Sequence, residues 1–144
     1  MITQITQAPP FGCGEPMQVV SDALLYFGLH FRHPIVMPDL AERLGTSLRC
    51  LDFSFDRIRG VTALQALQEH RLNKLFSALT EQPKQGLHRA ISACGLGETR
   101  GVVELFEQEF GIEMPLFLLT CRRAADDRQY RQLHPEPEAL IVPL

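Results

Sequence analysis

Several side chains have the types and spacing that metal sites or catalytic sites use, but none has the partners that such sites require. His30 and His33 stand three residues apart, and no third or fourth ligand follows at a supporting interval. His70, His88 and His134 have no neighbouring nucleophile or paired carboxylate that would suggest general-base catalysis. The sequence also lacks a glycine-rich phosphate-binding loop. We therefore expect no enzyme activity, no catalytic residue, no metal site and no cofactor.

The cysteines and the N-terminal residues bear on the cellular compartment. Cys13, Cys50, Cys94 and Cys121 are scattered without a CxxC pair, which is typical of reduced, mostly packed thiols inside a cell. The first sixteen residues lack the basic start and apolar core of a secretory signal. No run of eighteen apolar residues occurs, so we expect a cytoplasmic protein with no membrane partner.

Length and composition indicate an ordinary globular chain. The 144 residues are 45% hydrophobic and 22% charged, enough for one domain with short tails and unlike a disordered or collagen-like chain. Fourteen Lys and Arg residues stand against seventeen Asp and Glu, a formal net charge of −3. That balance argues weakly against a nucleic-acid partner, because phosphate binding usually leaves a basic surface.

Apolar residues at helical spacing, interrupted by glycine and proline, predict helices throughout the chain. The predicted helices cover residues 19–31, 38–44, 48–59, 61–79, 87–94 and 99–110, and a last apolar segment opens at Pro115. The fold class is therefore expected to be all-α. We expect an irregular lead-in over 1–18, helix-turn-helix subdomains over 19–60 and 81–122, a connecting helix over 61–80, and a polar, proline-containing, partly ordered tail over 123–144.

Residues 39–60 and 88–111 share one layout. Each has a short helix, a glycine turn, and a longer helix with a phenylalanine five residues before its closing glycine: Phe55 before Gly60, and Phe106 before Gly111. A helix, a tight turn and a second helix form the helix-turn-helix unit. Two such units joined by a long helix are a much more specific pattern than a single unit.

With this layout, the sequence resembles the DNA-binding domain of AraC/XylS-type bacterial transcription regulators over roughly residues 19–120. The resemblance depends on LAERLG before Ser47, Ser47…Leu51…Phe55…Gly60, Arg71-Leu72, the CGL motif at 94–96, and Phe106…Phe110-Gly111…Pro115. It implies a homeodomain-like pair of helix-turn-helix subdomains that binds double-stranded promoter DNA. The nineteen-residue connecting helix, roughly 28 Å long, is of the order of the 34 Å between successive major-groove turns.

The resemblance also implies which residues contact DNA. Residues 48–59 and 99–110 would be the recognition helices, with Arg49 and Arg100 placed to bond guanine and Phe53 or Val103 to pack on a thymine methyl. Arg57 and Arg59 would meet phosphates. The candidate residues of the first helix are Ser47, Arg49, Asp52, Phe53, Arg57 and Arg59, and those of the second are Thr99, Arg100 and Val103.

The second unit departs from the family pattern in its charge. Residues 95–113 hold five acids and one base, where relatives commonly carry basic residues, whereas residues 38–60 hold four of each. Carboxylates near phosphates weaken DNA binding. The alternative is therefore a degenerate domain that acts as a protein-interaction module, a co-regulator or antagonist that contacts RNA polymerase or another regulator.

About eighteen residues precede the first predicted helix, too few for the separate sensor domain that many relatives carry. We expect no small-molecule effector site within this chain. The sequence is that of either a stand-alone regulator, which the initial methionine slightly favours, or a fragment of a longer protein.

Overall fold

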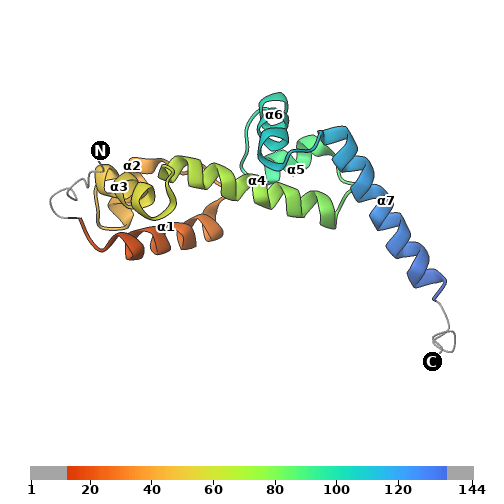
Figure 1. Cartoon of the computed structure of the whole chain (residues 1–144), viewed down its shortest axis with the longest axis horizontal. Coiled ribbons are helices and arrows are strands. Elements are labelled where there is room, and N and C mark those ends of the chain that lie inside the picture. Colours follow the sequence, from red (N-terminus) through yellow and green to blue (C-terminus); the bar gives the residue numbers. More distant parts are fainter. Residues whose placement is uncertain (1–12, 136–144) are drawn as a thin grey trace, which may run out of the picture. The chain divides into compact units, whose positions relative to one another are not determined.

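The computed structural model describes residues 13–135, and every regular element within that range is a helix (Figure 1). The helices are α1 (Pro16–His30), α2 (Met37–Arg43), α3 (Leu48–Arg59), α4 (Ala63–Glu81), α5 (Leu87–Ala93), α6 (Thr99–Phe110) and α7 (Met114–Leu133). The predicted all-α fold is confirmed. Contacts divide the described chain into two compact units, residues 13–74 with 92–96 and residues 75–91 with 97–135.

Helices α1 and α3 form the core of the first unit. Phe27 of α1 and Phe55 of α3 are fully buried, and their rings stack with centroids 6.2 Å apart. Leu40 of α2 and Leu51 of α3 are also buried. Each large apolar side chain buried in this way contributes about 1.5–3 kcal/mol. The packing therefore holds α2 and α3 together as a helix-turn-helix unit.

Local residue types fix the turn between α2 and α3. Gly45 has a φ of 72°, in the left-handed region that glycine adopts without a steric penalty. Ser47 then caps α3, because its Oγ accepts a hydrogen bond from the backbone N–H of Cys50 at 3.1 Å. The Ser47 side chain therefore fixes the start of α3.

Arg71 joins α4 to the end of α1, within the first unit. Its Nε donates to the Phe31 carbonyl at 2.9 Å, and its Nη2 donates to the His33 carbonyl at 2.8 Å. Gly95, with a φ of 75°, lies so close that a Cβ there would overlap the Phe31 carbonyl oxygen. Arg71 and the glycine of the CGL motif therefore have structural roles.

Four phenylalanines form the centre of the second unit. They are Phe76 of α4, Phe106 and Phe110 of α6, and Phe117 of α7, and five of their six ring pairs have centroids 4.7–6.1 Å apart. Offset and tilted aromatic pairs at such distances are stabilising. Glu107 joins α6 to α7, because its Oε2 accepts a hydrogen bond from the Met114 N–H at 2.8 Å.

The helical ends differ from the prediction at both ends of the chain. Helix α1 begins at Pro16, so residues 16–18 are not part of an irregular lead-in. Helix α7 continues to Leu133, so the predicted partly ordered tail is wrong for residues 123–133. This stretch contains neither glycine nor proline, and it consists largely of good helix formers with an Asp127–Arg131 ion pair at i,i+4. The remaining residues of the predicted lead-in and tail, 1–12 and 136–144, lie outside the described range.

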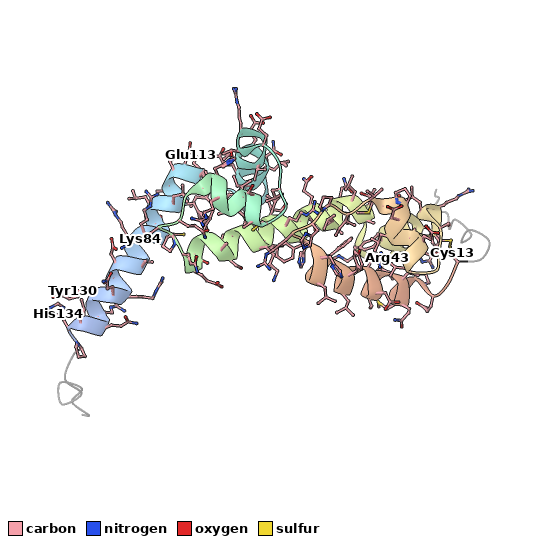
Figure 2. The ribbon with its side chains drawn as sticks, turned by 180° about the vertical axis from the view of Figure 1, so that it is seen from behind. Cys13, Arg43, Lys84, Glu113, Tyr130 and His134 are labelled. Carbon is pink, nitrogen blue, oxygen red and sulfur yellow. A yellow bond between two sulfur atoms is a disulfide. The ribbon has the colours of Figure 1, made fainter. Side chains whose placement is uncertain are left out.

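The cysteines divide into two pairs. Cys13 and Cys50 form a disulfide with Cα atoms 5.5 Å apart, so the expectation that both are reduced thiols is wrong (Figure 2). The segment before α1 reaches the first turn of α3, a proximity that a separation of 37 residues does not reveal in the sequence. Cys94 and Cys121 are free and buried, as packed thiols should be, and burial raises the pKa of each.

None of the helices within residues 13–135 is both long enough and apolar enough to cross a bilayer.

Candidate nucleic-acid interface

Helix α3 exposes one face opposite its packed side. Its buried residues are Cys50, Leu51, Ser54 and Phe55. At 100° per residue, the opposite face carries Arg49, Asp52, Phe53 and Asp56, and Arg57 and Arg59 flank it. The six candidate residues of the first unit therefore lie at the N-cap of α3 and along its outward side.

Two arginines on this face are available to an external anion. Arg49 and Arg57 are exposed, and neither forms an ion pair with another described residue. Arg59 instead lies 3.9 Å from Glu69 of α4, with both side chains about two-fifths exposed. A phosphate contact by Arg59 would therefore compete with an intramolecular partner.

The side chains of Ser47 and Asp52 already accept hydrogen bonds from backbone N–H groups of the protein. The Ser47 hydroxyl caps α3, and Asp52 Oδ1 accepts a hydrogen bond from the Ala63 N–H at the start of α4, at 3.2 Å. An N–H in the first turn of a helix has no partner within the helix, so Asp52 stabilises α4. The side chain of Phe53 is half-buried. Ser47 and Asp52 therefore help to position the face.

Sequence reasoning missed Asp56, which is exposed near the middle of the same face. It stands four residues after Asp52 and seven after Arg49, a spacing that places all three on one side of a helix. The periodicity alone could have found it. A carboxylate at this position can accept a hydrogen bond from cytosine N4 in the major groove.

Helix α6 exposes a weaker set of candidate residues. Arg100 is exposed, and Glu104 is exposed one turn further on. Thr99 is half-buried, with its Oγ1 at 3.0 Å from Nδ1 of His88, and Val103 is also half-buried. Of the three residues proposed for the second recognition helix, Arg100 alone is exposed.

The acids of the second unit do not act as one repulsive surface. Glu107 is half-buried and bonds the first N–H of α7. Glu98 and Glu113 stand at the N-cap positions of α6 and α7, where a carboxylate is stabilised by the positive end of the helix dipole. Glu104 and Glu109 remain exposed, and Glu104 stands one helical turn after Arg100.

Comparison with known proteins supports the fold. No protein-family model matches the sequence, and no curated protein does. Two solved structures match at a TM-score of 0.67 and 20% identity. One, from Rhodopseudomonas palustris CGA009, is a probable AraC family transcriptional regulator; the match covers 72% of this chain and 97% of that one. The other, from Chromobacterium violaceum, is a transcriptional regulator of the AraC-type DNA-binding domain-containing proteins; the match covers 73% of this chain and 93% of that one. This chain therefore has the helical fold of these AraC-type proteins, as the resemblance implied.

Proposed function

We propose that this protein is a sequence-specific DNA-binding transcription regulator that reads duplex DNA mainly through α3. The observation that carries the proposal is the outward face of α3, where Arg49 and Arg57 are exposed and free of ion pairs with other described residues. Two proteins with the same fold are described as transcriptional regulators, which supports the assignment.

In the proposed complex, α3 lies in the major groove with its first turns toward the bases. Arg49 bonds guanine O6 and N7, and Arg57 meets the phosphate backbone. Helix α6 enters the next turn of the groove and offers Arg100. The continuous helix α4, with nineteen residues and a length of roughly 28 Å, is of the order of the 34 Å repeat that this arrangement requires.

Helix α6 is expected to contribute less affinity than α3, because Glu104 lies beside Arg100. A nearby carboxylate opposes phosphate binding and offsets part of the gain from the arginine. A protein partner such as RNA polymerase or another regulator would then supply the remaining contacts at a promoter.

The exposed acids of α6 favour a second candidate function. Glu104 and Glu109 project from α6 without an ion-pair partner among residues 13–135. A basic protein surface would complement them, so the domain would act as a co-regulator or antagonist with little DNA binding of its own. This candidate predicts no retention on heparin and a protein partner in a pull-down.

Selection from random duplexes at two salt concentrations tests the first candidate. We expect a motif to be enriched, with two elements about one helical turn apart. Arg49→Ala should relax the preference at one position of the motif, whereas Arg128→Ala, which removes an exposed arginine of α7, should leave the motif unchanged. Failure to enrich any motif, together with no heparin retention, would favour the second candidate.

A further inference from the structure

The second half of α7 has little core of its own. Met114, Phe117 and Cys121 are buried against the second unit, but from Arg122 to Leu133 every residue is exposed except the half-buried Ala125. Figure 1 shows these last turns extending away from α5 and α6, and Figure 2 labels Tyr130 near the C-terminal end of α7. A helix that is exposed over most of its length offers a surface to a partner.

Large apolar side chains follow this surface at regular spacing. Leu116, Leu119, Tyr130 and Leu133 are 53%, 45%, 61% and 68% exposed. Arg123 and Asp126 lie between the two apolar pairs. The six positions are separated alternately by three and four residues along the helix, which is the repeat of a coiled-coil seam. We call Leu116, Leu119, Arg123, Asp126, Tyr130 and Leu133 the α7 seam. On a helical projection it lies opposite the buried residues of α7.

We propose that the α7 seam binds the α7 seam of a second copy of this chain, with the two helices antiparallel. The seam is symmetric about its midpoint, between Arg123 and Asp126. An antiparallel pair in register therefore places Leu116 against Leu133, Leu119 against Tyr130 and Arg123 against Asp126, each twice. The apolar layers lie at the two ends, and two oppositely charged pairs lie at the centre.

The charges of the seam select this orientation. A parallel pair would set Arg123 against Arg123 and Asp126 against Asp126, which is repulsive. A charged layer inside a coiled coil lowers stability but fixes register and orientation. Within its own chain, Asp126 lies 3.4 Å from Lys84, and both side chains remain about two-thirds exposed. The Asp126 carboxylate is therefore open to a second cation.

The interface is small. It has six positions on each helix, and its central layer is polar. The dimer should therefore be reversible and should depend on protein concentration. This inference does not depend on the proposed DNA binding.

Charge exchange within the seam gives the test, with sedimentation equilibrium of the full chain as the readout. Arg123→Asp and Asp126→Arg each create like-charge pairs in the homodimer and should weaken it by about 100-fold or more. The double variant, and an equimolar mixture of the two single variants, restore opposite charges and should dimerise within about threefold of wild type. Arg128→Asp, the same charge change on the face opposite the seam, should have little effect.

Circular dichroism provides the control for folding, since all substituted side chains are exposed. The proposal is overturned if wild type remains monomeric at several hundred µM, if Arg123→Asp dimerises as well as wild type, or if the mixture of folded single variants stays monomeric. Crosslinking of Leu116→Cys to Leu133→Cys in a mixed sample, without crosslinking of Leu133→Cys to itself, would confirm the antiparallel orientation.

Discussion

His70 of α4 is a polar side chain in an apolar setting. Its ring packs edge-on against Phe31 at 5.4 Å, and its Nε2 is buried without a hydrogen-bond partner among the described residues. Burial lowers the pKa of His70 below its ordinary value, and the positive charges of Lys74 and Arg71 lower it further. The folded protein therefore favours the neutral imidazole.

This pKa shift predicts an acid-sensitive stability. Below about pH 6.5 the unfolded chain binds a proton at His70 more readily than the folded chain does, so stability falls as the pH decreases. We expect the Tm to decrease as the pH is lowered from 7 to 5.5, and the slope of Tm against pH to be smaller in His70→Gln. His88→Gln, at an exposed position, serves as the control. Equal slopes in all three proteins would contradict the prediction.

At the scale of residues, the sequence could predict which side chains share the outward face of α3, because helical periodicity determines it. It could not predict that Asp52 bonds the Ala63 N–H, or that Arg59 lies beside Glu69, because both partners belong to the next helix. The same holds for Glu107, which sequence reasoning counted only as a negative charge. Charge counts along a chain do not distinguish a surface acid from a helix cap.

At the scale of elements, the link between α6 and α7 depends on the Glu107 carboxylate. Glu107→Ala leaves the Met114 N–H without its protein partner, so we expect a loss of about 0.5–2 kcal/mol in the free energy of unfolding. Glu107→Gln keeps an acceptor and should retain most of the stability. Glu109→Ala removes an exposed acid from the same helix and is the matched control. Chemical denaturation measures the effect, and equal stability of Glu107→Ala and Glu109→Ala would exclude the capping role.

Most helices could be predicted because glycine, proline and apolar spacing mark them locally. The second half of α7 was missed because its polar composition resembles that of a tail, and its seam contains only two apolar residues beyond Cys121. The seam becomes visible only when Leu116 and Leu119 are known to be exposed. Burial, and not sequence spacing, separates a core helix from an interaction surface.

At the scale of the whole molecule, the Cys13–Cys50 disulfide ties the segment before α1 to α3. Closing a loop of this length stabilises a protein by about 2–4 kcal/mol, mainly by restricting the unfolded chain. Addition of a reductant should therefore lower the Tm of the oxidised protein by on the order of 10 °C. In Cys13→Ser the Tm should already be low, and the reductant should change it no further. An unchanged Tm on full reduction of wild type would contradict this role.

The proposed function requires that the outward face of α3 binds duplex DNA. Titration of a fluorescent duplex carrying the selected motif, followed by anisotropy at several salt concentrations, tests it most directly. We predict saturable binding, with an association constant whose logarithm falls linearly with the logarithm of salt concentration. The Arg49→Ala/Arg57→Ala double variant should lose at least about tenfold in affinity, and Arg128→Ala should lose none. Equal affinity of wild type and the double variant, or no binding by wild type at low salt, would contradict the claim.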